Sequence, residues 1–106
     1  MQRTIEIQKI ANRVNFTVEN THKLLEIFYE STDKILNNLE TYIKQNDYDK
    51  IYRNAHSLKG SSSNLLFDDV YVIAKEIESS AKEELDYPYL NKLHEIRAII
   101  KTTKIV

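Results

Sequence analysis

Hydrophobic residues recur along the chain at spacings of three and four, which is the pattern of helices that bury one face. The clearest run extends from Thr21 to about Gln45. Its hydrophobic positions are Leu24, Leu25, Phe28, Ile35, Leu36, Leu39, Tyr42 and Ile43. Charged residues occupy many of the positions between them, as expected on the solvent face of an amphipathic helix. This pattern predicts one long helix, with Asn20 or Thr21 as its N-cap.

A shorter segment with the same period precedes the long helix. It extends from Thr4 to about Val14, and Ile7, Ile10 and Ala11 lie on the same side as Val14. A helix of this length is marginal in isolation. We therefore predict a short additional N-terminal helix within residues 1–16.

Three further helices are predicted after the long one. The first runs from Tyr48 to about Leu66, and the second follows a turn in which Asp68 and Asp69 offer capping carboxylates. The third follows a break at residues 86–88, where an Asp precedes a proline, and it frays into residues 101–106. Asp47 can cap the first of them. In the same order, the hydrophobic stripes of these three helices are Ile51, Ala55, Leu58, Ser62 and Leu65 for the first; Val70, Ile73, Ile77 and Ala81 for the second; and Leu90, Leu93, Ile96 and Ile100 for the third.

The composition also favours an all-α fold. The chain has 106 residues, enough for one domain, and contains a single Gly and a single Pro. These are too few for the frequent turns of a β-rich fold. Short connections between long helices favour antiparallel neighbours. We predict a single domain of residues 1–106, built as an antiparallel up-down four-helix bundle over residues 17–101 with a short additional N-terminal helix.

Charge and cysteine content exclude several classes of protein. Lys and Arg total 15 against 16 Asp and Glu, so the chain lacks the basic excess typical of proteins that bind nucleic acid or anionic membranes. Without cysteine, it can form neither disulfides nor thiolate metal sites. No hydrophobic run approaches the roughly 20 residues of a membrane span, and no signal peptide is recognisable. We expect a cytoplasmic protein that binds neither nucleic acid nor membranes.

The single glycine, Gly60, falls inside the helix predicted for residues 48–66, where it costs about 1 kcal/mol relative to Ala. Residues 59–64 could instead form a loop, in which Gly60 ends one helix and a serine begins the next. The hydrophobic stripe, however, keeps its phase through Leu58, Ser62 and Leu65. Because a loop has no reason to preserve that phase, we predict a continuous helix.

In a continuous helix His56 points about 140° away from the core direction set by Ile51. Tyr52 lies one turn before it, Lys59 three residues after it and Gly60 one turn after it. A neutral imidazole is a nitrogen nucleophile, and a phosphoryl group on it would bring about two negative charges that an ammonium can help to hold. The missing Cβ of Gly60 would let a partner approach closely. An ordinary surface histidine is the simpler interpretation, but the costly glycine favours the functional one.

The run Ala-His-Ser-Leu-Lys-Gly-Ser-Ser at residues 55–62 resembles the signature of histidine phosphotransfer (HPt) domains, the helical phosphocarriers of two-component relays. The resemblance extends over residues 17–101. It implies that His56 exchanges a phosphoryl group with an aspartate on a receiver domain. It also implies that Lys59 and Gly60 serve the phosphate and the docking surface. Many members have a small residue shortly after this run, where the present chain has Leu66 and Phe67, so the end of the signature helix is left open.

Glu78 is predicted to contact His56. Each residue lies 11 positions from Phe67, so in an antiparallel hairpin the two sit at the same level. Glu78 could then accept a hydrogen bond from Nδ1–H and leave Nε2 free to attack. The phosphoacceptor domains of chemotaxis kinases are similar in using a carboxylate there. The alternative is a solvated Glu78 that pairs with Lys82 one turn later.

The resemblance and the residues together predict a phosphocarrier, with no enzymatic activity of its own and no cofactor. Its expected partners are response-regulator receiver domains, a histidine kinase, or both, and Mg²⁺ is expected only on the receiver. The predicted docking residues are Tyr52, Arg53, Ser63, Asn64, Phe67, Lys75 and Lys82.

Two other functions stay open at this stage. The chain could be a non-catalytic helical adaptor with His56 merely on its surface, or a phosphoacceptor domain excised from a larger histidine kinase. A metal site is not expected, because His22 and His94 have no His or Cys partner at ligand spacing.

Overall fold

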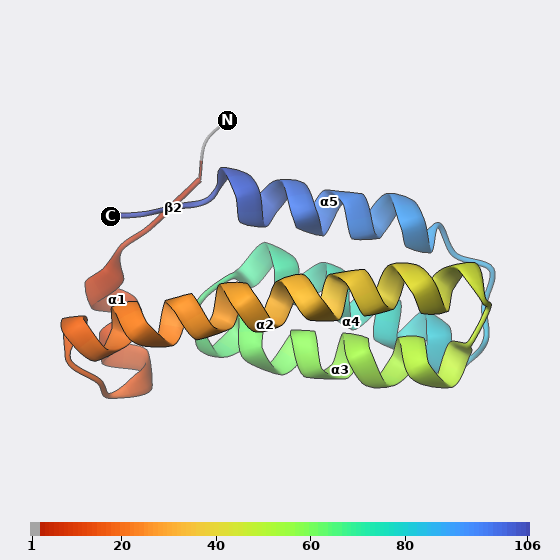
Figure 1. Cartoon of the computed structure of the whole chain (residues 1–106), viewed down its shortest axis with the longest axis horizontal. Helices are drawn as coiled ribbons and strands as arrows, with labels where there is room; N and C mark the ends of the chain where they lie inside the picture. Colours follow the sequence, from red (N-terminus) through yellow and green to blue (C-terminus); the bar gives the residue numbers. More distant parts are fainter. Residues whose placement is uncertain (1–2) are drawn as a thin grey trace.

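Five helices and two short strands make up the part of the chain that the structure describes, residues 3–106 of a computed structural model. In chain order they are β1 (Thr4–Ile5), α1 (Ile7–Val14), α2 (Val18–Lys44), α3 (Tyr48–Asn64), α4 (Asp68–Lys82), α5 (Tyr89–Thr102) and β2 (Lys104–Ile105). The predicted all-α class is confirmed. Figure 1 shows α2 to α5 lying side by side with the chain reversing direction at each turn, while α1 lies at one end of them.

The hydrophobic stripes of α2 to α5 meet in one core. Each of these helices contributes a side chain with no exposed surface: Leu39, Leu58, Ile77 and Leu93. The closest packing is between α3 and α4. Helix α3 runs without interruption through Gly60, so the predicted continuous helix is confirmed. This continuity gives every side chain on α3 a defined direction relative to α4.

Two helix starts differ from their predictions. The N-cap of α2 is Thr17, whose hydroxyl accepts a hydrogen bond from the Asn20 amide at 3.1 Å, so Asn20 and Thr21 already lie within the helix. Phe67 occupies the N-cap position of α4 without a side-chain cap, and Asp68 and Asp69 lie in the first turn. There they interact favourably with the positive end of the helix dipole rather than capping it. Asp47 caps α3 as predicted, by accepting from the Lys50 amide at 3.3 Å.

The two ends of the chain form strands, which corrects two further predictions. Thr4 and Ile5 pair in parallel with Lys104 and Ile105, so the first helix begins at Ile7 and the last segment does not fray. The periodicity within either end is too short to reveal this pairing, because the partners lie about 100 residues apart in the chain. None of the helices in the described residues combines the length and hydrophobicity that crossing a bilayer requires.

A left-handed residue after α4 gives a test of the helix ends. Glu84 has φ 54°, in the region where glycine is favoured, and its side chain is exposed. We expect Glu84→Gly to raise the free energy of unfolding by about 1 kcal/mol and the Tm by about 5 °C, measured by denaturation. The matched change Glu83→Gly, at φ −95°, should lower stability instead. Equal effects of the two changes would contradict this account.

Candidate functional site

His56 stands on the outer face of α3, and its side chain is 64% exposed. The neighbouring residues Ala55 and Leu58 are fully buried and hold this part of the helix against the core. The imidazole is therefore mounted on a rigid helix and not on a loop. Such a position presents a nucleophile to a partner while keeping its direction fixed.

Glu78 on α4 holds one nitrogen of His56. Its Oε2 lies 2.5 Å from Nδ1, and its own side chain is only 11% exposed. The predicted contact between these residues is therefore present, and Glu78 forms no ion pair with Lys82 among the described residues. An ionised carboxylate can only accept, so Nδ1 carries the hydrogen. In the neutral imidazole Nε2 then has the lone pair.

Lys59 binds the other oxygen of the same carboxylate. Its Nζ lies 2.7 Å from Oε1 of Glu78, and its side chain is 26% exposed. Lys59 and His56 both lie on α3, so one carboxylate from α4 joins two groups on the facing helix. The short contacts, to an ammonium and an imidazole N–H, are charge-assisted hydrogen bonds.

These contacts shift the pKa values of both charged partners. Burial raises the pKa of the Glu78 carboxyl, but the hydrogen bonds from Lys59 and His56 outweigh burial, and the net pKa lies below its usual value. The hydrogen bond to Glu78 raises the pKa of Lys59. Glu78 is therefore an anion and Lys59 a cation at neutral pH. This is the arrangement that keeps Nδ1 protonated and places positive charge beside the imidazole.

Gly60 has no structural role inside this chain that demands glycine. It lies in regular helix with negative φ, and a Cβ added there would meet no atom within 4 Å beyond its chain neighbours and the adjoining backbone of its own helix. Neither backbone strain nor packing against another element therefore explains the residue. What the glycine leaves is open space on the surface one turn from His56. That space is available to an approaching partner.

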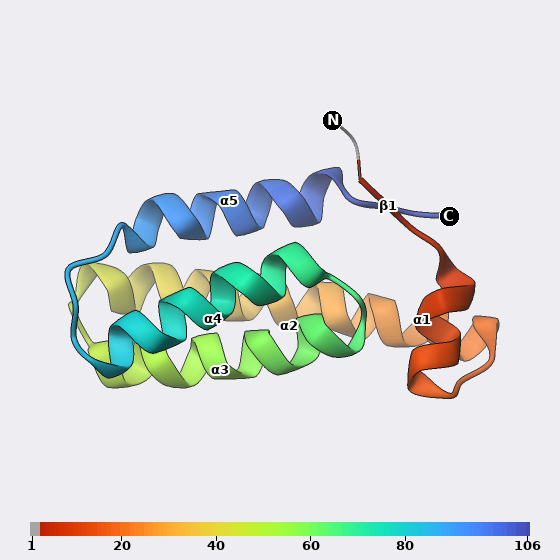
Figure 2. The ribbon, with the colours of Figure 1, turned by 180° about the vertical axis from the view of Figure 1, so that it is seen from behind.

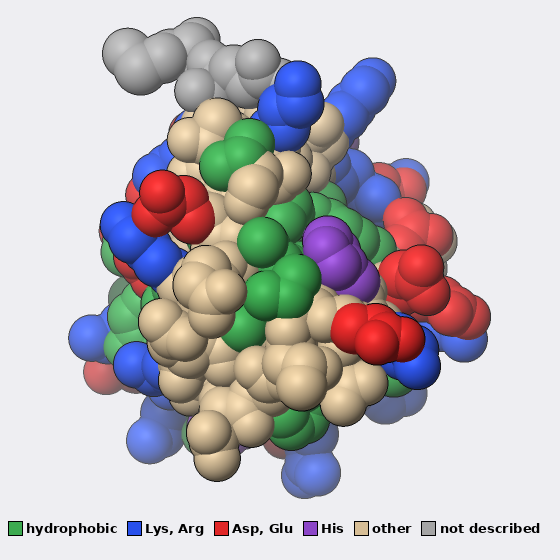
Figure 3. Space-filling view, turned by 90° about the vertical axis from the view of Figure 1, so that its left-hand side faces the viewer, with side chains coloured by type: hydrophobic (Ala, Val, Ile, Leu, Met, Phe, Trp, Pro, Cys, Tyr) green, Lys and Arg blue, Asp and Glu red, His purple; other side chains and the backbone are tan. Residues whose placement is uncertain are grey.

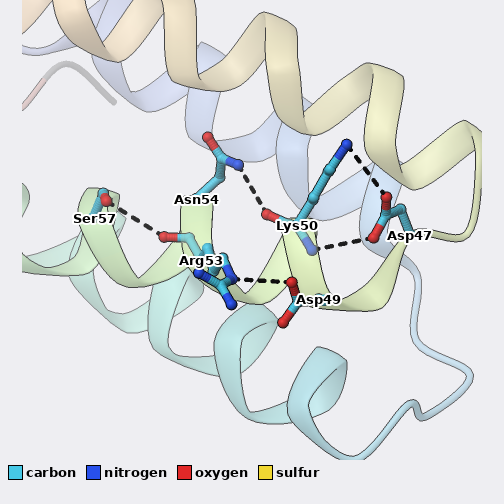
Figure 4. Close-up of polar contacts among 6 residues, drawn as sticks. All are labelled: Asp47, Asp49, Lys50, Arg53, Asn54 and Ser57. Atoms are coloured by element: carbon cyan, nitrogen blue, oxygen red, sulfur yellow. Dashed lines mark hydrogen bonds and ion pairs between the residues drawn. The ribbon is translucent and has the colours of Figure 1, made fainter.

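Tyr52 and Arg53 lie on the turn that precedes His56. The Tyr52 ring stacks on the imidazole with the centroids 6.4 Å apart, so it supports one side of the ring. The Arg53 Nε donates to Asp49 at 2.9 Å, and its carbonyl accepts from Ser57. Figure 4 shows the two contacts of Arg53, with Asp49 and with Ser57, along α3. Arg53 is thus available at the surface but already has an acidic partner.

The remaining predicted docking residues divide into three groups. Ser63 is half-buried and Asn64 exposed, both in the last turn of α3. Lys75 and Lys82 are exposed on α4, on either side of Glu78, and neither forms an ion pair within residues 3–106. Phe67 is only 2% exposed. Its prediction as a docking residue is wrong.

Phe67 is buried because the turn between α3 and α4 points it inward. Its ring lies 4.9 Å from that of Phe28 and 6.1 Å from that of Tyr29, so it packs under the turn with two aromatic residues of α2. Leu66, at φ 64°, is the residue that makes this turn after α3 ends at Asn64. The unusual Leu66 and Phe67 pair therefore serves the core.

Sequence reasoning predicted Asn64 as a docking residue but did not locate the apolar groove that it lines beside the site, which we call the α1–α3 groove. It has a volume of about 320 Å³ and is lined by Val14, Phe16, Leu24, Ile27, Phe28, Ser31, Ser61, Asn64 and Leu65. Phe16 is 48% exposed and Ile27 63%. Figure 3 shows hydrophobic side chains gathered beside a histidine at the end of the molecule that carries α1. Ile27, a hydrophobic residue off the stripe of α2, was the available signal.

No group of three potential ligands that could hold a metal ion occurs within residues 3–106. His22 and His94 are both exposed. The site that the structure assembles is therefore the set of His56, Glu78, Lys59 and Gly60, with the α1–α3 groove beside it.

Comparison with protein families agrees with this geometry. The family model described as the Hpt domain matches residues 23–102. The chain belongs to the Hpt domain family. No curated protein and no solved structure matches it. Membership implies a histidine phosphotransfer role in phosphorelays, with receiver domains or kinases as the interacting class. Hpt domains are phosphocarriers and not true catalysts.

The lowered pKa of Glu78 makes the stability of this Hpt domain pH-dependent. A carboxyl with a lowered folded-state pKa stabilises the fold above its unfolded pKa, and this contribution is lost as the pH falls through the folded pKa. We expect the difference in unfolding free energy between wild type and Glu78→Gln to shrink as the pH is lowered from 7 through the acidic range of a Glu carboxyl. Urea denaturation across that range measures it. A difference independent of pH would contradict the pairing.

Proposed function

We propose that this Hpt domain is a phosphocarrier in a two-component phosphorelay. It accepts a phosphoryl group on His56 and transfers it to or from an aspartate of a response-regulator receiver domain. The observation that carries the proposal is the exposed imidazole whose Nδ1 is held by the ionised Glu78, on the surface of a family member. The relay is a cytoplasmic one, and this chain needs no cofactor of its own.

In the transfer step the lone pair of Nε2 attacks the phosphorus of an aspartyl phosphate. The N–P bond forms and the P–O bond to the carboxylate breaks, so the receiver recovers a free aspartate. No proton leaves Nε2, because it carries none, and Nδ1–H stays bound to Glu78. Positive charge that develops on the imidazole is stabilised by that carboxylate. The receiver supplies Mg²⁺ and its acidic cluster.

Lys59 stabilises the product of this step. The phosphoryl group adds about two negative charges to the surface of α3. The Lys59 ammonium is on the adjacent turn and is held in place by its 2.7 Å contact with Glu78. Lys75 and Lys82 add positive charge from α4. In this scheme Glu78 and Lys59 orient and balance charge, and positioning supplies most of the rate.

The receiver docks on the side of His56 that faces away from α4. Gly60 leaves room there, and the α1–α3 groove offers exposed Phe16 and Ile27 as apolar contacts. Asn64 lies at the rim of the groove, Ser63 in the same last turn of α3 and Tyr52 beside the imidazole itself. Protein–protein interfaces usually have an apolar centre and a polar rim. Phe67 takes no part because it is buried.

Replacing the imidazole tests the proposal directly. After incubation with a phosphorylated receiver, wild type should gain a label that is labile in acid and stable in alkali, as a phosphohistidine is. His56→Gln should lose this label completely, because the nucleophile is gone. His22→Gln and His94→Gln, at two other exposed histidines, are matched controls and should label as wild type does.

The same assay separates the competing functions. An adaptor would gain no label from any donor, which would overturn the proposal. A domain excised from a histidine kinase would label faster from a kinase domain with ATP than from a phosphorylated receiver.

Changing Gly60 separates stability from transfer. Gly60→Ala should raise the free energy of unfolding by about 1 kcal/mol, because the helix tolerates a Cβ that meets nothing. The rate of transfer from a phosphorylated receiver should nevertheless fall about tenfold or more, because the Cβ displaces the partner. Ser57→Ala, at another exposed position of α3, is the control. Unchanged transfer in Gly60→Ala would show that the glycine does not serve docking.

A further inference from the structure

Helix α1 lacks the usual features that stabilise the start of a helix. It has only 8 residues, its N-cap Glu6 forms no side-chain cap, and its first turn contains no acidic residue. A helix this short is marginal without outside support. The support comes from the far end of the chain, because the amide of Ile7 donates to the carbonyl of Val106 at 2.8 Å. Val106 thus satisfies a donor that the helix itself leaves unpaired.

The backbone just before α1 is held by the same C-terminal segment, which comprises β2 and Val106. The amide of Lys104 donates to the carbonyl of Arg3 at 2.8 Å, and that of Val106 to the carbonyl of Ile5 at 2.9 Å. Ile5 and Ile105 pack against the core, and Arg3 forms an ion pair with Asp69 of α4. Figure 2 shows β1 and the C-terminal segment meeting near the end of α5, with β1 leading on into α1. The segment therefore anchors α1 at its first residue.

The other end of α1 leads into the α1–α3 groove. Val14 is the last residue of the helix and Phe16 follows it, and both line the groove. Ile10 and Ala11 are the buried residues of α1, and they attach its middle mainly to α2. Any tilt of α1 about this middle contact would move Val14 and Phe16. The position of one wall of the groove thus depends on the anchor at the first residue.

We propose that β2, together with Val106 directly after it, is a positioning element for the docking surface. By binding residues 3–7, it holds α1 so that Val14 and Phe16 complete the α1–α3 groove, and it thereby sets the affinity for the receiver. This inference rests on the proposed function, because it names the receiver as the occupant of the groove. His56, Glu78 and Lys59 lie on α3 and α4 and make none of the contacts of β2. Loosening β2 should therefore weaken docking without changing the chemistry of the imidazole.

A matched pair of changes at Lys104 isolates the backbone contact. Lys104→Pro removes the amide that donates to Arg3, whereas Lys104→Ala retains it. The preceding residue, Thr103, has φ −75° and ψ 130°, which is the conformation that a following proline favours. Because α5 already ends at Thr102, the proline leaves that helix intact. Val106→Pro, which removes the amide that donates to Ile5, is an independent second variant.

Three measurements on the full chain test the inference. For Lys104→Pro we expect hydrogen exchange of the α1 amides to accelerate about tenfold. The Kd for a receiver domain should rise about five- to tenfold. Labelling of His56 by phosphoramidate, a small donor that needs no docking, should stay within about twofold of wild type. Lys104→Ala should match wild type in all three, and Ile27→Asp, which places a charge in the groove, is the positive control for lost affinity.

Each contrary result has a distinct meaning. Unchanged exchange in α1, or an unchanged receiver Kd despite faster exchange, overturns the positioning role of β2. If Lys104→Pro loses its helical circular dichroism, the same criteria apply to Val106→Pro. A wild-type chain that takes no label on His56 from phosphoramidate or from a receiver overturns the proposed function instead.

Discussion

The carboxylate of Glu78 is the constraint on which the site depends. It is an anion almost completely covered by protein, and such a charge is tolerated only with good partners. Both partners, the Nδ1–H of His56 and the ammonium of Lys59, come from the facing helix. Satisfying this one charge therefore fixes the level of α3 against α4, the tautomer of the imidazole and the place of the neighbouring cation together.

The two sides of His56 have different surroundings. On the side of α4, polar groups hold the imidazole, and Tyr52 stacks on its ring. On the other side the surface is open, from the missing side chain of Gly60 to the α1–α3 groove. In the proposed function, the chemistry and the docking are thus carried by different elements, α3 and α4 for the first and α1, α2 and the end of α3 for the second. This separation lets one be altered without the other.

Much of this arrangement could be predicted from local patterns. Each helix shows the hydrophobic period of 3.6 residues within its own sequence. The direction of His56 and the continuity of α3 through Gly60 could therefore be predicted without knowing which helices pack against α3. Even the contact between His56 and Glu78 could be predicted, because the two residues lie the same number of positions before and after the turn between α3 and α4. The first residue of each helix was harder to predict from the sequence. Thr17 and Asn20 have side chains with similar capping ability, and only the backbone conformation decides which of them is the N-cap.

By itself, then, the sequence determined a mainly helical chain with a nucleophilic imidazole on its surface beside a glycine that costs helix stability, because these features depend on residues within a turn or two of each other. The tertiary structure alone decided that Phe67 is buried against Phe28, that Ile27 lies exposed in a groove, and that Lys104 binds the backbone of Arg3. These features depend on contacts between segments far apart in the chain. The periodicity within one helix does not predict such contacts, because they form and stabilise the fold only once the helices have packed.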